Sequence, residues 1–201
     1  MSHQIGVNED VYMELKQKAV EIQKRAEETT VTQIMMEMMD LPSVPIHHPY
    51  HHFILPAAFL TATAIEQKMP EEELIEKLDE ANLRANNVLG GFCGNYGACG
   101  SGIGAGIFMS IMTDTTPLSN ESWQWANEVT GKCLQAISTV PGPRCCKRTG
   151  FLAAIEAVDY INSKLGLHLR VDDNIVCRYY DQNNECKREQ CPFYLIESIC
   201  K

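Results

Sequence analysis

Apolar residues recur every three or four positions over much of the chain, with charged and polar residues between them, which is the pattern of amphipathic helices. Six segments carry the pattern or are apolar on nearly every side: residues 11–26, 53–65, 70–88, 101–112, 119–137 and 148–165. A shorter Met-rich stretch, residues 34–39, predicts a turn or short helix with methionines that fill the core. We therefore expect a mainly α-helical fold of about six helices.

Prolines and helix-capping residues mark the expected boundaries. Pro56 is expected in the first turn of its helix, where a missing N–H is tolerated, and Pro70 is followed by three glutamates that favour a helix start. Ser119 is the expected N-cap of a helix that buries Trp123, and Ile155 is expected on the buried face of the last helix. These boundaries predict a single helical domain.

The pattern weakens beyond residue 166. A short extended piece over residues 174–180 and a loop-rich, cysteine-containing segment are expected there. We divide the chain into an N-terminal helical segment, residues 1–44, and a cysteine-rich helical core with a metal-binding tail, residues 45–201.

Charge and composition exclude several classes of partner. The 201 residues carry a net charge of −9 and a pI near 5.1, which disfavours nucleic acid. The longest apolar stretch, residues 53–65, is shorter than the roughly 20 residues that cross a membrane. Residues 1–10 lack the basic start and apolar centre of a secretion signal, so a cytoplasmic location is expected. The nine cysteines are then expected as thiols or metal ligands, not disulfides.

Three cysteines in the tail form the most specific motif. Cys177, Cys186 and Cys191 follow the pattern Cys-x8-Cys-x4-Cys-Pro, and a closing Cys-Pro is typical of iron–sulfur sites. A four-iron cluster takes four thiolates, so Cys145 or Cys146 completes the set or one iron stays open to a substrate. Zinc is the alternative, because tetrahedral zinc sites use the same thiolates. The chain has no Cys-x-x-Cys, which favours a [4Fe–4S] cluster.

A glycine-rich loop, residues 90–102, holds a second pair of cysteines. Cys93 and Cys99 lie directly before a predicted helix, whose unpaired amides favour the thiolate form of a nearby cysteine. We expect a catalytic redox or persulfide-carrying pair, or a second set of ligands; the alternative is a structural loop.

Arg144-Cys145-Cys146-Lys147-Arg148 also stands at a predicted helix start. Arg144, Lys147 and Arg148 are expected to bind an anionic cluster or substrate, and to face the same cavity as Cys93 and Cys99.

Four histidines lie within residues 47–52. They are metal ligands, general bases, or turn and cap residues. Because adjacent side chains point in different directions, we expect at most two of them to share a site, and His51 or His52 to act there as a ligand or in proton transfer.

These motifs together resemble a known family. Residues 51–56, 91–107, 142–148 and 177–192 are similar to an uncharacterised cysteine-rich family of anaerobic bacteria and archaea, over roughly residues 45–194. Its members occur alone or joined to methyltransferase or radical-SAM-type domains, and the family has no established activity. The resemblance implies a redox or methyltransferase partner protein but no mechanism.

Three functional hypotheses follow. The first is an iron–sulfur enzyme that acts on a small sulfur-containing or anionic molecule, by desulfuration or sulfur transfer. The second is a non-enzymatic electron-transfer module for a methyltransferase or radical enzyme, and the third is a zinc-stabilised interaction domain. Metal content and turnover of a thiolated substrate distinguish them.

Overall fold

The computed structural model describes residues 6–25 and 27–194, which form eight α-helices and two short 3-10 turns without any strand. The α-helices are α1 (Glu9–Arg25), α2 (Val31–Met39), α3 (Tyr50–Gln67), α4 (Glu71–Asn86), α5 (Phe92–Asn95), α6 (Gly100–Met112), α7 (Glu121–Ser138) and α8 (Cys146–Leu165). The expected mainly α-helical class is confirmed. The six long helices lie where the pattern predicts them. The short helices α2 and α5, the latter a single turn, bring the number of α-helices to eight.

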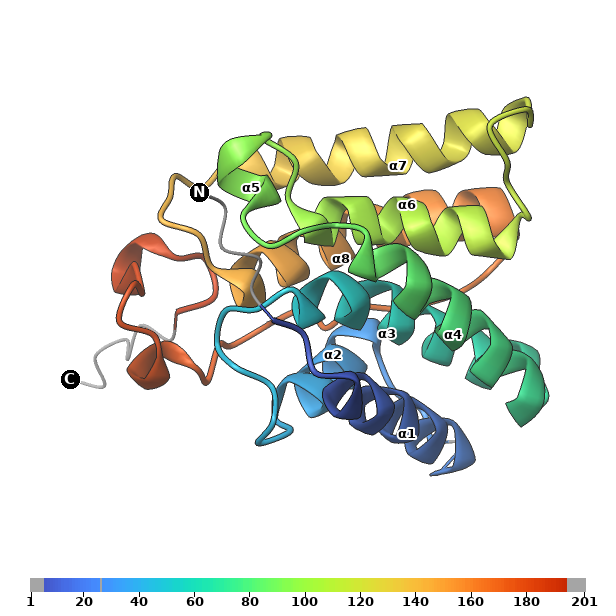
Figure 1. The fold of residues 1–201 in the computed structure, drawn as a ribbon, viewed down its shortest axis with the longest axis horizontal. Coiled ribbons are helices and arrows are strands. Elements are labelled where there is room, and N and C mark those ends of the chain that lie inside the picture. Colours follow the sequence, from blue (N-terminus) through green and yellow to red (C-terminus); the bar gives the residue numbers. More distant parts are fainter. Residues whose placement is uncertain (1–5, 26, 195–201) are drawn as a thin grey trace.

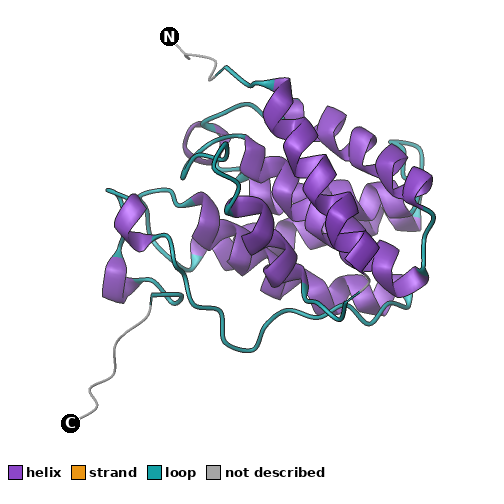
Figure 2. Cartoon of the chain, turned by 90° about the horizontal axis from the view of Figure 1, so that it is seen from below, coloured by secondary structure: helices purple, strands orange, loops and turns teal. Residues whose placement is uncertain are grey.

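Helix α3 is the centre of the fold, and α1, α2, α4, α6 and α8 all contact it. Every residue from Phe53 to Ala64 is buried, which explains why this segment is apolar all round. Figure 1 shows α6, α7 and α8 together on one side of α3, where α7 packs on α6 and α8. Figure 2 shows the same assembly of helices from below. The N-terminal helices α1 and α2 share this core through buried residues such as Leu15 and Ile34.

Pro56 does not lie in the first turn of α3, contrary to the sequence-based expectation. The helix begins at Tyr50, so Pro56 is in its interior, where it removes the N–H that would bond to the carbonyl of His52. Helix α6 approaches closely at this point: a Cβ at Gly104 would lie 2.9 Å from Pro56 Cδ and 3.1 Å from His52 O. The proline and the glycine therefore mark a tight α3–α6 contact.

Two apolar side chains expected in the core are exposed. Trp123 is 49% exposed and Ile155 is 42% exposed. The buried face of α7 is formed by Val129 and Cys133 instead, and Cys133 donates to the carbonyl of Ala153 on α8 at 3.4 Å. The expected N-cap of α7, Ser119, is replaced by Asn120, which makes no side-chain cap hydrogen bond.

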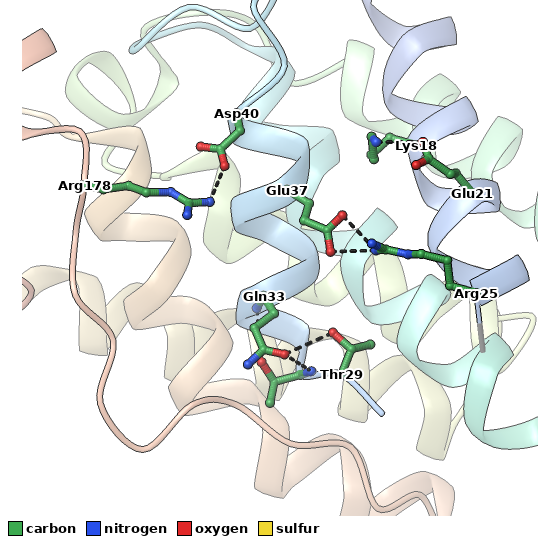
Figure 3. A network of polar contacts seen from close by, with 9 residues as sticks. Lys18, Glu21, Arg25, Thr29, Gln33, Glu37, Asp40 and Arg178 are labelled. Atoms are coloured by element: carbon green, nitrogen blue, oxygen red, sulfur yellow. Dashed lines mark hydrogen bonds and ion pairs between the residues drawn. The ribbon is translucent and has the colours of Figure 1, made fainter. Parts of the chain in front are cut away.

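Helix α2 ties the tail to the core through polar contacts (Figure 3). Asp40, at its C-terminal end, pairs with Arg178 and accepts a 2.8 Å hydrogen bond from the Tyr179 hydroxyl. On the opposite side, Glu37 pairs with Arg25 of α1 at 2.7 Å. The tail is thus anchored at the two residues that directly follow its first cysteine, Cys177.

The extended piece expected over residues 174–180 is not a strand. One backbone bond closes this part of the tail, from the Cys177 N–H to the Phe193 carbonyl at 2.7 Å. Phe193 packs edge-on against Phe151 of α8, with ring centroids 5.3 Å apart. The tail therefore folds back on itself and docks on α8. Ala26 of the first predicted helix and Cys200 lie outside the described residues.

None of the helices in the described part of the chain combines the length and the apolar content that crossing a bilayer requires.

Candidate functional site

The first turn of α8 separates two cavities. Cys145 is the N-cap of this helix and Cys146 is its first residue. Cys145 and Arg148 line both cavities, Lys147 lines an enclosed one beside the tail, and Cys146 lines an open cleft beside the glycine-rich loop. The tail, α8 and α5 meet at this end of the molecule, as Figure 1 shows.

Four cysteines line the enclosed cavity. Cys145 comes from the start of α8, and the tail supplies Cys177, Cys186 and Cys191. The cavity measures about 20 Å³, and Tyr179 and Phe193 contribute to its wall. We name it the cysteine cavity. The structure thus brings the tail motif to Cys145 and not to Cys146.

Hydrogen-bond donors surround these sulfurs. Asn183 Nδ2 lies 3.7 Å from Cys145 Sγ, and the Arg188 N–H lies 3.4 Å from Cys186 Sγ. Burial raises the pKa of the Cys145 thiol, whereas the amides of Arg148 and Lys147 at the start of α8 act in the opposite direction. These donors suit sulfur atoms that carry negative charge.

The four sulfurs share a cavity but do not converge on one point. Among the described residues, no three His, Cys, Asp or Glu side chains are placed to hold a single metal ion. Burial raises the pKa of the Cys177 thiol as well, so the unligated thiols of Cys145 and Cys177 are protonated at neutral pH. Metal binding would have to displace these protons.

A buried lysine stands beside the cysteine cavity. Lys147 is 1% exposed, and its Nζ lies 3.0 Å from His51 Nε2 and 4.7 Å from the centre of the Tyr179 ring. Burial lowers the pKa of Lys147 to about 8, and the neighbouring Cys146 and Cys145 oppose that shift. The expectation that Lys147 faces the same cavity as Cys93 and Cys99 is wrong, because its side chain points to the tail.

His51 is buried, and both of its ring nitrogens have hydrogen-bond partners. Its Nδ1 lies 3.0 Å from the His48 carbonyl and donates to it, so Nε2 accepts from Lys147. Burial, followed by the charge of Lys147, lowers the pKa of His51 well below its usual value. His51 therefore stays neutral and positions Lys147.

The open cleft measures about 350 Å³ and is lined by three further cysteines. Cys93, Cys99 and Cys146 line it, and the starts of α6 and α8 form its floor. Cys93 is exposed, whereas burial raises the pKa of the Cys146 thiol to about 12. The glycine-rich loop and the start of α8, predicted from the sequence to share a cavity, lie together here.

His52 is the histidine that is available to the cleft. Its Nδ1 donates to the Val88 carbonyl at 2.8 Å, which leaves Nε2 as a lone-pair acceptor. Burial lowers the pKa of His52, so the neutral form prevails. Gly100 packs against the ring: a Cβ at this position would lie 2.0 Å from His52 Cδ2. The ring is thus fixed between Val88, just after α4, and the start of α6.

Two arginines border the cleft in different ways. Arg144 is exposed and lies 3.9 Å from Glu185. Arg148 is only 4% exposed; its Nη2 donates to the Pro143 carbonyl at 2.8 Å, and its buried Nε has no partner. Within residues 6–25 and 27–194, neither Arg148 nor Lys147 has a carboxylate within ion-pair distance.

Sequence reasoning missed two residues of the site, Tyr179 and Asn183. Tyr179 covers Lys147, and buried Asn183 bonds to His47 Nε2 at 3.0 Å while it faces Cys145 Sγ. Both lie in the polar segment between the tail cysteines, which the motif treats as spacer. No local pattern distinguishes them from their exposed neighbours.

The comparisons with known proteins give one match. A family model described as a family of unknown function (DUF5714) covers residues 19–194. The chain belongs to this family. The DUF5714 match begins inside α1, so it crosses the expected boundary between residues 44 and 45 and includes every residue of both cavities. No curated protein and no solved structure matches the chain.

Proposed function

We propose that this DUF5714 protein binds an iron–sulfur cluster, of the [4Fe–4S] type, through Cys145, Cys177, Cys186 and Cys191. We also propose that the adjacent cleft acts on a small sulfur-containing or anionic molecule. The observation that carries the proposal is the cysteine cavity, in which four cysteines from two distant segments meet beside a buried lysine. Four thiolates are the ligand set of such a cluster.

Electrostatics supports an anionic group in this place. Lys147 is buried without an ion-pair partner in the described residues, and an uncompensated buried charge is costly. Four deprotonated cysteines around a cluster supply negative charge next to this lysine. The N–H groups directed at Cys145 and Cys186 stabilise the same charge.

The spacing of the cysteines favours a cluster over zinc, because the chain contains no Cys-x-x-Cys, a common spacing in tetrahedral zinc sites. Each iron of a [4Fe–4S] cluster takes one thiolate, so four cysteines complete the ligand set. Because the cavity holds about 20 Å³, a cluster requires the segment between the anchors at Tyr179 and Phe193 to move outward from α8. The regular structure of that segment consists of two 3-10 turns. A zinc-stabilised tail remains the alternative.

With four cysteines as ligands, no iron is open, so chemistry on a small molecule falls to the cleft. In sulfur transfer, the Cys99 thiol gives its proton to His52 and attacks the outer sulfur of a persulfide R–S–SH. The S–S bond breaks, Cys99 keeps the outer sulfur as a persulfide, and R–S⁻ leaves as a thiol with the proton from His52. Atoms and electrons balance without an external oxidant or reductant.

The second candidate function is an electron-transfer module for a methyltransferase or radical enzyme. A cluster with every iron ligated favours it, because such clusters carry electrons without binding substrate. Turnover of a persulfide by the isolated protein distinguishes the enzyme from the module.

Anaerobic purification followed by iron, acid-labile sulfide and zinc analysis tests the proposal. We expect about four irons and four sulfides per chain for a [4Fe–4S] cluster. Chelation of the metal should make the tail sensitive to trypsin at Lys187 and Arg188, because metal binding supplies part of its folding free energy. Zinc without sulfide would replace the cluster by a zinc site, and no metal with an equally resistant tail would contradict both.

A further inference from the structure

The geometry points to a second ligand site in the cleft, for a small carboxylate with a short apolar chain. The carboxylate lies at the start of α6 beside Arg148, and the chain lies toward the apolar wall of α7. This inference rests on the part of the proposed function that places a small molecule in the cleft, and not on the cluster.

The first observation is the uncapped start of α6, a helix of 13 residues. Its N-cap, Cys99, makes no side-chain cap hydrogen bond, and the first turn contains no acidic residue. No oxygen of the described residues accepts a hydrogen bond from the N–H groups of Gly100, Ser101 or Gly102. These donors and the positive end of the helix dipole favour an anion at the cleft floor.

The second observation is independent of the helix. Arg148 lines the cleft and is only 4% exposed, and its buried Nε has no hydrogen-bond partner. The guanidinium end is held toward the cleft side, because Nη2 bonds to Pro143, which lines the cleft and not the cysteine cavity. A buried guanidinium is compensated by an oxyanion, which it recognises through paired N–H groups.

The starts of α6 and α8 are joined on the cleft floor. Ser101 Oγ and Thr149 Oγ1 lie 3.4 Å apart, so the amides of α6 and the guanidinium of Arg148 keep a fixed relation. Such preorganised donors bind an anion without rearrangement of the protein.

The opposite wall defines the rest of the ligand. Leu134, Ile137 and Val140 line the cleft from α7 and the residues after it, so an apolar chain is accommodated beside the polar floor. A volume of about 350 Å³ lies at the lower end of small-molecule sites. A short aliphatic carboxylate matches both walls, and it brings its chain to the thiols of Cys99 and Cys146.

Paired alkylating reagents test the inference on the anaerobically purified protein with its native metal content. Iodoacetate carries a carboxylate and iodoacetamide is its neutral analogue, and both react with the same thiolate. The ratio of their rate constants at Cys99 and Cys146, measured by peptide mass spectrometry and divided by the ratio for N-acetylcysteine, reports carboxylate recognition alone. The net charge of −9 opposes iodoacetate, so a high ratio must come from the cleft.

We expect a normalised ratio of roughly ten at one of these cysteines. Arg148→Gln should bring it close to one, whereas Lys132→Gln, which removes an exposed cation of α7, should leave it unchanged. Butyrate should slow the reaction of the wild-type protein with iodoacetamide, and butyramide should not. If Arg148→Gln fails to fold, protection by butyrate and not by butyramide tests carboxylate binding in the wild-type protein.

A ratio of one, an elevated ratio that survives in folded Arg148→Gln, no protection by butyrate, or complete inertness of both thiols would overturn the inference. Iron and sulfide are measured on the same samples. Loss of the carboxylate preference with full metal content contradicts this inference alone, and a retained preference without metal contradicts the cluster alone.

Discussion

At the start of α8, the chemical role of each residue depends on which of the two cavities its side chain faces. The sequence identifies Cys145, Cys146 and the flanking cations as candidates, because cations beside thiols at a helix start stabilise thiolate or a bound anion. It does not indicate which cysteine faces the tail, because helical periodicity gives the phase of a residue but not what packs opposite. The burial of Lys147 is likewise not predictable from the sequence, because lysine is rarely fully buried and only tertiary contacts place it against the Tyr179 ring.

The buried His51 makes an acid-sensitive contribution to stability. Its pKa in the folded protein lies well below 6.5, the value expected in the unfolded chain. As the pH falls below 6.5, the unfolded chain binds a proton that the folded protein excludes, so stability decreases by up to about 1.4 kcal/mol per pH unit. His51→Gln should reduce this slope, measured by urea unfolding between neutral pH and about pH 5.

His168→Gln is the control for that measurement. The His168 side chain is 90% exposed, so this variant measures how much of any change comes from replacing an exposed histidine by glutamine. Identical slopes for wild-type protein and His51→Gln would show that His51 is protonated in the folded state.

Among the secondary-structure elements, the long periodic helices are predictable and the contacts between them are not. The six long helices follow from apolar spacing, whereas α5 is a single turn in a glycine-rich loop without any periodic signal. Pro56 argues locally for a helix start, yet tertiary packing of α3 holds it in a helix interior. The glycines of α6 lie in a segment that the sequence predicts as a helix, and the structure shows that Gly102, Gly104 and Gly106 allow α3 and α7 to approach closely.

Two glycines on neighbouring helices should respond to alanine in opposite directions. A Cβ at Gly106 of α6 would lie 2.1 Å from Thr130 Oγ1 and 3.1 Å from the Ala126 carbonyl, so Gly106→Ala should destabilise by about 1–3 kcal/mol. Gly131 of α7 has no neighbour within 4 Å of such a Cβ. Gly131→Ala should stabilise by up to about 1 kcal/mol through helix propensity. Unfolding free energies check both, and equal effects would contradict the close α6–α7 packing.

The whole molecule assembles its two cavities from segments that are far apart in the sequence. The glycine-rich loop meets the start of α8 on one side, and the tail meets it on the other. Anchors such as Asp40 with Tyr179, and Phe151 with Phe193, hold the tail against the core. The cysteine motif predicts a shared site, but its fourth member depends on these long-range contacts, which no local pattern contains.

The adjacent cysteines of α8 provide the most direct test of the central claim, that Cys145 and the three tail cysteines hold one cluster. Cys145→Ser and Cys146→Ser make the same chemical change one residue apart, but Cys145 lines the cysteine cavity as well as the cleft, whereas Cys146 lines the cleft and not the cysteine cavity. After anaerobic purification, we predict that Cys145→Ser loses most of its iron and acid-labile sulfide, while Cys146→Ser keeps the wild-type content. Equal retention in both variants, or loss in Cys146→Ser alone, would contradict the assignment.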